Sequence, residues 1–186
     1  MTKKTMSLVA VLLLVLSLGL LPAAAETEEN TIYVNIANAG KLEAAMEPIA
    51  LADADGDGAL TVNDALILIH DAKYEGGAAA GFATADSQYG PMITKLWGVE
   101  NGGSYGYYVN NTMSMGLTDP VAAGDVVYAF VYADAAGFSD AYSYFDKSQA
   151  EIADGEELTL TLSKADGFDA NYAPIYKPLE GAVITV

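Results

Sequence analysis

Alternating apolar and polar residues mark the first ordered segment after the N-terminal region. Residues 31–37 (TIYVNIA) alternate with a period of two, which is typical of a half-buried strand. Asn38-Ala39-Gly40 indicates a turn, and residues 44–51 predict a second, weaker strand. Because Pro48 cannot donate a backbone hydrogen bond, we expect this second strand at a sheet edge.

The period becomes helical after residue 61. An apolar stripe is formed by Ala65, Leu68, Ile69 and Ala72. Thr61 and Asp64 have the spacing of a capping box, so we expect the helix to begin there and to end near Tyr74, before a glycine pair. By the same period His70 falls on the polar side of the helix, where we expect a surface histidine.

The middle of the chain predicts more strands. Gly76 to Pro91 is rich in glycine and alanine and predicts an ordered loop. Residues 93–99 and 105–110 are strand-like and are joined by Asn101-Gly102-Gly103, which favours a hairpin. Residues 126–132 (VVYAFVY) are continuously apolar and predict the central strand of the sheet.

This order of elements predicts an α+β fold, a β-grasp-like mixed sheet with one helix, over residues 26–137. From residue 138 to 186 the pattern changes to short strands separated by acidic turns, which predicts an incomplete all-β segment. We expect this segment to be the truncated start of a second β (Ig-like) domain. Its predicted strands are residues 141–145, 157–162 and 182–186.

Residues 1–25 have the composition of a signal peptide. Lys3 and Lys4 precede an apolar run from Leu8 to Leu21, and Ala23-Ala24-Ala25 supplies small residues for cleavage. The run is shorter than the roughly 20 residues that span a bilayer, although an uncleaved anchor is the alternative. We therefore expect an extracellular or cell-surface protein with no membrane insertion after signal cleavage.

Charge and composition narrow the function. The chain has 25 Asp and Glu residues against 8 Lys and Arg, a formal net charge of −17, and its basic residues are all lysines. This acidity argues against nucleic-acid partners and anionic membranes, and it favours divalent cations. One histidine and no cysteine exclude zinc or haem sites of the usual kind.

An acidic loop, DADGDGALTVND from Asp53 to Asp64, is the clearest candidate site. Oxygen donors on alternate residues of a tight loop can converge on Ca²⁺, and Gly58 permits the turn. The expected ligands are Asp53, Asp55, Asp57, the Ala59 carbonyl, Thr61 through a water, and Asp64. We also expect Leu60 to anchor the loop in the core. The alternative is an acidic turn without metal, in which four carboxylates would repel one another.

Asp64 at loop position 12, Gly56 at position 4 and the following ALILI run resemble a dockerin type I repeat, an EF-hand-like calcium motif. A dockerin module has two such repeats, and the sequence contains one. We therefore do not expect the cohesin binding that a complete dockerin would provide.

A wider resemblance covers residues 31–134. The segments DALILIHDAKYEGG, ITKLWG, YGYYVNN and GDVVYAFVY resemble the transcobalamin C-terminal-like (intrinsic factor β-domain-like) family of β-grasp domains. In transport proteins of this kind, the resemblance implies, the domain covers one side of a corrinoid and a helical domain covers the other. This chain has no helical domain, so the resemblance assigns no corrinoid-binding residue.

Four aromatic residues are candidates for ligand binding: Trp97, Tyr105, Tyr107 and Tyr108. They could form an aromatic platform, as in carbohydrate binding, or they could pack across strands. Strand geometry places Tyr105 and Tyr107 on one face and Tyr108 on the other, so one face must belong to the core.

The sequence contains no serine-histidine-aspartate order and no phosphate-binding loop, and we expect no enzyme. The favoured function is a non-catalytic calcium-binding module, a binding or scaffold unit for an unidentified protein, glycan or small ligand. One alternative is a corrinoid (cobalamin) or other small-ligand binding protein. Another is the accessory region of a larger surface enzyme.

Overall fold

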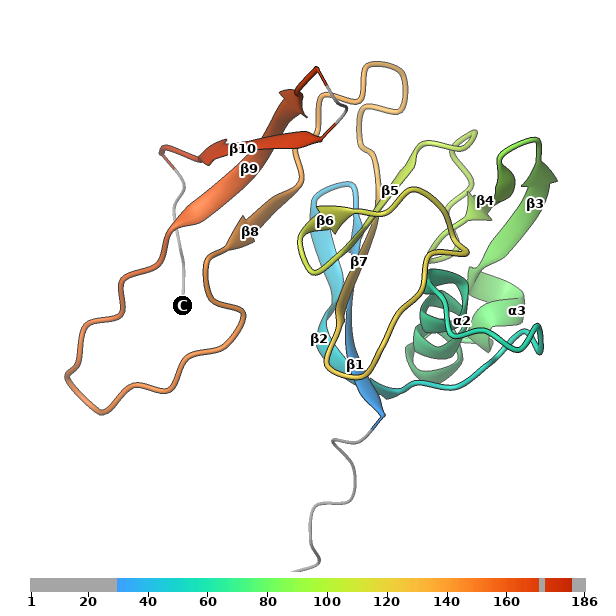
Figure 1. Cartoon of the computed structure of the whole chain (residues 1–186), viewed down its shortest axis with the longest axis horizontal. Helices are drawn as coiled ribbons and strands as arrows, with labels where there is room; N and C mark the ends of the chain where they lie inside the picture. Colours follow the sequence, from blue (N-terminus) through green and yellow to red (C-terminus); the bar gives the residue numbers. More distant parts are fainter. Residues whose placement is uncertain (1–29, 171–172, 182–186) are drawn as a thin grey trace, which may run out of the picture.

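A computed structural model describes residues 30–170 and 173–181 of the chain. The described residues form ten strands and two helices (Figure 1). In chain order they are β1 (Thr31–Asn38), β2 (Lys41–Ala50), α2 (Val62–Lys73), α3 (Gly77–Gly81), β3 (Ala83–Ser87), β4 (Gly90–Lys95), β5 (Tyr105–Val109), β6 (Thr112–Met113), β7 (Val126–Val131), β8 (Ser143–Phe145), β9 (Leu162–Phe168) and β10 (Pro174–Pro178).

The main layer is a five-stranded mixed sheet with the order β2-β1-β7-β5-β6. β1 and β7 pair in parallel, and the other neighbours pair antiparallel. The predicted fold class, a mixed sheet with one main helix, is therefore confirmed. β7 lies in the centre, and β2 lies at an edge with Pro48 opposite Tyr33, both as the sequence predicts.

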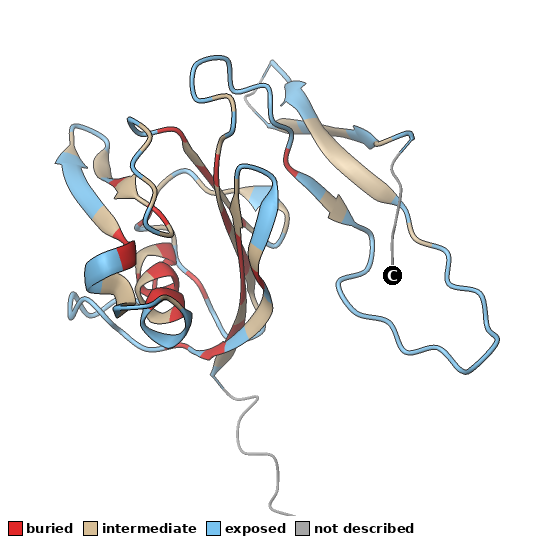
Figure 2. Ribbon diagram, turned by 180° about the vertical axis from the view of Figure 1, so that it is seen from behind, coloured by how far each residue is buried: buried red, intermediate tan, exposed pale blue. Residues whose placement is uncertain are grey.

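The core lies between this sheet and α2, where the buried residues gather in Figure 2. The register places Val34 opposite Val127 and Ile36 opposite Ala129, so β1 and β7 present one continuous apolar face. Fully burying one such aliphatic side chain contributes roughly 1.5–3 kcal/mol. The helix contributes Val62, Ala65, Leu66 and Ile69 to the same core.

Helix α2 starts where the sequence predicts, but its buried stripe is rotated. Leu66 and His70 are fully buried together with Ala65 and Ile69, whereas Ala72 is exposed. The rotation has a physical cause, because α3 and the turn after β4 pack against the side of α2 that periodicity assigns to solvent.

The prediction of a surface histidine is wrong. His70 has no exposed area. Its Nδ1 lies 2.6 Å from the Leu66 carbonyl oxygen, and its Nε2 accepts the Trp97 backbone N–H at 3.0 Å. Its ring lies 5.3 Å from Phe82 and 5.0 Å from Trp97 between centroids. A neutral imidazole has one donor and one acceptor, and both are satisfied here. Burial lowers the pKa of His70 below its ordinary value.

The segment predicted as a loop, residues 76–91, contains α3, β3 and the start of β4. β4 pairs with β3 and not with β5, so the predicted hairpin between residues 93–99 and 105–110 is also wrong. The pattern of apolar and polar residues could not reveal the observed β3–β4 hairpin, because β3 is largely exposed and lacks an apolar face.

The C-terminal strands form a separate three-stranded antiparallel sheet in the order β10-β9-β8. β8 falls within the predicted strand 141–145, but β9 begins only at Leu162, and β10 was not predicted. Residues 157–161 of the predicted strand do not belong to β9, because its partner strand β8 ends at Phe145, which pairs with Leu162. The predicted strand 182–186 lies outside the described residues.

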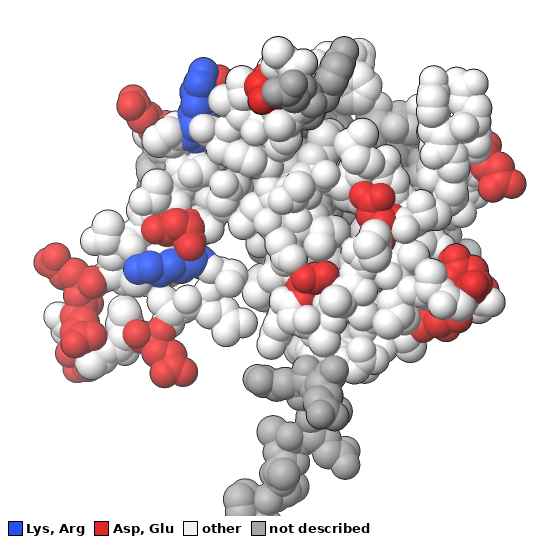
Figure 3. All heavy atoms as spheres, in the orientation of Figure 1, with Lys and Arg blue, Asp and Glu red and all other residues white. Residues whose placement is uncertain are grey.

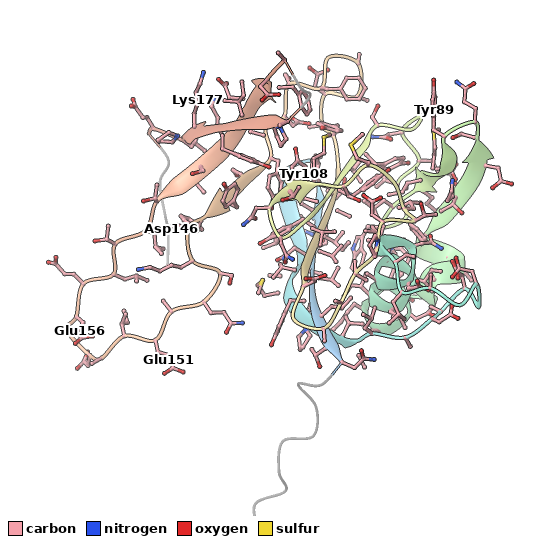
Figure 4. The ribbon with its side chains drawn as sticks, in the orientation of Figure 1. Tyr89, Tyr108, Asp146, Glu151, Glu156 and Lys177 are labelled. Atoms are coloured by element: carbon pink, nitrogen blue, oxygen red, sulfur yellow. The ribbon has the colours of Figure 1, made fainter. Side chains whose placement is uncertain are left out.

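Tyrosines join this sheet to the five-stranded sheet. Tyr142 stacks on Tyr108, which is labelled in Figure 4, with the ring centroids 3.8 Å apart. The Tyr142 hydroxyl donates to Asn111 Oδ1 at 2.8 Å, and the Tyr176 hydroxyl donates to the Asn111 carbonyl oxygen. The turn between β5 and β6, with Asn110 and Asn111 at positive φ, is therefore one point at which the two sheets touch.

The burial of His70 predicts a pH dependence of stability. The native pKa is lowered, so the unfolded chain takes up a proton as the pH falls below about 6.5 while the native protein does not. The free energy of unfolding should therefore fall by up to about 1.4 kcal/mol per pH unit until native His70 titrates. Urea unfolding in chelator at pH 7.5, 6.5 and 5.5 measures this dependence of the free energy of unfolding on pH.

His70 is the only histidine of the chain, so the control is direct. The variant His70→Gln should be less stable at every pH, but its free energy of unfolding should be nearly constant over the same range. Equal slopes in the two proteins would contradict the assignment.

Candidate metal centre

The loop that links β2 to α2 is fixed at both ends. Leu51 is buried, and its N–H donates to the Asn30 carbonyl at 2.7 Å. At the other end Thr61 is buried and pairs with Pro120 in a β-bridge. The loop between them projects beside α2 (Figure 1), and Gly58 adopts a φ of 89° within it. Both ends of the acidic segment are thus held by the folded body.

Three carboxylates come together in this loop. Oxygen atoms of Asp53, Asp55 and Asp57 lie within 4.8 Å of one another, and all three residues are exposed. This group could hold a metal ion. Three like charges so close together repel one another, and a cation between them would remove that repulsion.

Backbone N–H groups orient these carboxylates. Asp53 accepts from Gly56 at 2.7 Å and from Gly58 at 2.9 Å. Asp55 accepts the N–H of Asp57 at 3.1 Å, and Asp57 accepts that of Ala59 at 2.8 Å. The loop closes around its own side chains, so the oxygen atoms have fixed directions in the folded chain.

Asp64, the predicted ligand at position 12, has a different environment. It has no exposed area and lies outside the group of three. Its Oδ1 accepts the N–H groups of Ala54 at 2.7 Å and Asp55 at 3.3 Å, and its Oδ2 accepts the N–H and the hydroxyl of Thr61 at 2.9 and 2.8 Å. One carboxylate therefore ties the start of the loop to the start of the helix.

The pKa of Asp64 follows from this environment. Burial alone would raise it, but the hydrogen bonds from the Thr61 hydroxyl and from the backbone of Ala54, Thr61 and Asp55 lower it below its ordinary value. Asp64 is therefore ionised in the folded protein at neutral pH.

The other predicted ligands are placed differently. The Thr61 hydroxyl is engaged in the capping box with Asp64. Ala59 is exposed and touches the group through its hydrogen bond to Asp57. Leu60, expected in the core, is 37% exposed, and it anchors the loop instead through its carbonyl oxygen, which accepts the Val121 N–H at 2.9 Å.

Asn63 is a residue of this site that sequence reasoning missed. Its Nδ2 donates to Asp55 at 2.7 Å, so the first turn of α2 supports the carboxylate group directly. Its Oδ1 is buried and has no hydrogen-bond partner within the described residues. The available signal was an amide in the first helical turn, beside the last acidic loop position.

The start of α2 is also held by a distant segment. Val62 and Asn63 donate their backbone N–H groups to the carbonyls of Asp119 and Leu117, at 3.0 and 2.9 Å. Leu117 has no exposed area. These first-turn N–H groups have no partner inside the helix, so residues 117–119 satisfy them and position the loop against the fold.

The four aromatic candidates do not gather on one surface. Tyr105 and Tyr107 lie on the α2 side of the sheet and pack against the core. Trp97 packs edge-on against Tyr74 and contacts the His70 ring. Tyr108 lies on the opposite face beneath Tyr142.

No protein-family model matches the chain, and no curated protein and no solved structure matches it. In residues 30–170 and 173–181, no helix has both the length and the apolar character needed to cross a membrane.

The position of Asp64 predicts a mutational contrast. In chelator, Asp64→Ala should lower the free energy of unfolding by about 3 kcal/mol, because it removes the N3 member of the capping box and several charge-assisted hydrogen bonds. Asp57→Ala should change the free energy of unfolding by less than about 1 kcal/mol, because Asp57 is exposed and, within the described residues, its carboxylate accepts one N–H, that of Ala59. Urea titrations of both variants provide the comparison.

Asp154→Ala, in the exposed loop before β9, is the matched control and should leave the midpoint unchanged. Equal destabilisation by Asp57→Ala and Asp64→Ala would show that the two carboxylates have the same role, against the structure.

Proposed function

We propose that this chain is a secreted or cell-surface, non-catalytic calcium-binding module that acts as a binding or scaffold unit. The observation that carries the proposal is the group of three carboxylates, Asp53, Asp55 and Asp57, within 4.8 Å of one another in a loop with fixed ends.

Calcium is the ion that best fits these donors. Ca²⁺ takes six to eight oxygen ligands at flexible geometry, whereas Mg²⁺ requires a tight octahedron and gives up its water reluctantly. Zinc and copper prefer nitrogen or sulfur, and the only histidine of the sequence, His70, is fully buried with its ring nitrogens bonded to Leu66 and Trp97. The carboxylates supply charge, and the Ala59 carbonyl and water would complete the ligand set.

A structural role for the ion is supported by the anchors of the loop. Leu51 and Thr61 are buried at its two ends, and Asn63 links Asp55 to the first turn of α2. An ion bound between the carboxylates would stiffen a segment that is already docked. A sensor would need a bistable helix pair, which a single loop of this kind does not supply.

A non-catalytic role is supported by the position of His70. The side chain most often used for acid-base chemistry near neutral pH is fully buried, and both of its ring nitrogens have partners. Acidic side chains are spread over the visible face and lysines are sparse (Figure 3), which suits a soluble unit with a neutral or basic partner.

Calcium should raise the thermal stability of the protein. With an affinity typical of extracellular modules, a dissociation constant on the order of 0.1 mM, about 1 mM calcium stabilises the fold by roughly 1.4 kcal/mol. Because about 1 kcal/mol shifts the melting temperature of a domain of this size by roughly 2–8 °C, the rise should be about 3–11 °C. Differential scanning calorimetry in calcium, magnesium and chelator measures it.

Asp53→Ala should abolish this rise, and Asp154→Ala should retain it. A melting temperature that is the same in chelator and in millimolar calcium would eliminate the calcium proposal. A larger rise with zinc than with calcium would contradict the choice of ion.

Export should remove the N-terminal segment. The apolar run Leu8–Leu21 followed by Ala23-Ala24-Ala25 predicts cleavage after Ala25. Intact mass spectrometry of the exported protein should give a chain that begins at Glu26. A mature protein that retains Leu8–Leu21 would contradict secretion by this route, and a variant with a charged residue in the run should accumulate uncleaved.

A further inference from the structure

The sheet face opposite α2 is aromatic. The register places Tyr128 between Asn35 on β1 and Tyr108 on β5, and it places Phe130 between Ala37 and Gly106. These residues lie on the side of the sheet that faces away from the core. Full exposure of these aromatic side chains to water would be unfavourable, so we asked which segment of the chain covers them.

Residues 140–148, which include β8, lie over this face and line one side of a half-open cavity. Its volume is about 400 Å³, which is within the range of roughly 300–1,000 Å³ of small-molecule sites. The sheet side is lined by Asn35, Ala37, Leu42, Met46, Tyr128 and Phe130, and the crossing segment adds Tyr142 and Tyr144.

The aromatic rings of the cavity are held in place by their neighbours. Tyr142 lies 5.4 Å from Tyr128 with the rings nearly perpendicular, and 6.2 Å from Phe130 with the rings nearly parallel. Gly106 leaves room for the Phe130 ring, since a Cβ there would lie 2.2 Å from its Cζ. The walls are therefore preorganised, and flat rings favour a flat ligand.

Asn35 supplies a polar group to this cavity. It is only 8% exposed and lines the cavity beside Tyr128. Its Oδ1 accepts the Met46 N–H at 2.8 Å, but its amide NH₂ contacts only the Met46 thioether sulfur, at 3.5 Å. Thioether sulfur is a weak acceptor, so within the described residues this buried donor lacks a good partner. A ligand acceptor would satisfy it.

The charges around the cavity indicate the charge of its ligand. Asp140 and Lys147 both line the cavity, so neither sign dominates there. The chain as a whole carries a formal charge of −17, which disfavours anions. A corrinoid, with its macrocycle and nucleotide arm, is too large to be enclosed in about 400 Å³.

We propose that this cavity binds a neutral, flat aromatic molecule that carries a hydrogen-bond acceptor. The rings of Phe130, Tyr128 and Tyr142 contact the aromatic body, and the Asn35 NH₂ donates to the acceptor. This assignment rests on the binding role proposed above but not on the calcium loop, which is formed by other residues.

The test uses the fluorescent ketone prodan, a neutral naphthalene with a carbonyl acceptor, titrated into the full chain. Its emission should shift to the blue on binding. Asn35→Ala should weaken prodan binding about fivefold, the scale of one hydrogen bond, yet leave the affinity for 2-(dimethylamino)naphthalene, which lacks the carbonyl, unchanged. This difference between two probes separates a lost hydrogen bond from general damage to the fold.

Phe130→Leu should weaken both probes about three- to tenfold, since it removes a ring but keeps an apolar side chain. Tyr89→Leu is the matched control, because Tyr89 is 84% exposed in the turn between β3 and β4 and lies apart from Tyr108 in Figure 4. It should leave both affinities unchanged. Ala37→Leu, which narrows the cavity, should weaken both probes even if Asn35→Ala fails to fold.

Absence of a blue shift with the wild-type chain, or equal prodan affinity in all variants, would overturn the proposal. Titrations in chelator and in 1 mM calcium keep the two proposals distinct. Prodan binding without calcium stabilisation would refute the calcium role alone, and calcium stabilisation without prodan binding would refute the cavity alone.

Discussion

The arrangement of the N-terminal half depends on one buried carboxylate. Asp64 accepts hydrogen bonds from Ala54, Asp55 and Thr61, so a single side chain closes the acidic loop and completes the capping box of α2. An ionised group in the interior is tolerated only when its oxygens are satisfied, and here the backbone satisfies both. Once Asp64 is fixed, the exposed carboxylates of the loop have little freedom to separate. Their mutual repulsion is then a property of the native fold, which a cation can relieve.

The features that the sequence predicts well are those that short-range chemistry determines. Thr61 and Asp64 form a capping box because their spacing alone permits it, and α2 follows. The run VVYAFV forms the central strand because a strand that is buried on one face and half-buried on the other needs apolar residues on both. Alternate aspartates converge because a tight loop brings positions 1, 3 and 5 together. Each of these inferences needed no knowledge of distant neighbours.

The errors in the fold mostly involve contacts between distant segments. Period alone assigns His70 to solvent, but α3 and the backbone of Trp97 cover it. The β3–β4 hairpin lacks an apolar face, so pattern gives no sign of it. The cover of the aromatic sheet face depends on Tyr142, which is 34 positions from Tyr108 in sequence yet stacks on it at 3.8 Å. Local period carries no information about such pairs, and only the folded arrangement reveals them.

The parallel pairing of β1 with β7 has a mechanical consequence. The chain enters the sheet at Thr31 and leaves the central strand at Val131, and six residue pairs join these two strands side by side. Tension applied to the segments before β1 and after β7 therefore acts along the strands and loads this ladder in shear. Its hydrogen bonds must then break together, whereas a hairpin pulled at its open end would lose them one at a time. A chain pulled from these two ends should therefore resist extension until the whole ladder breaks.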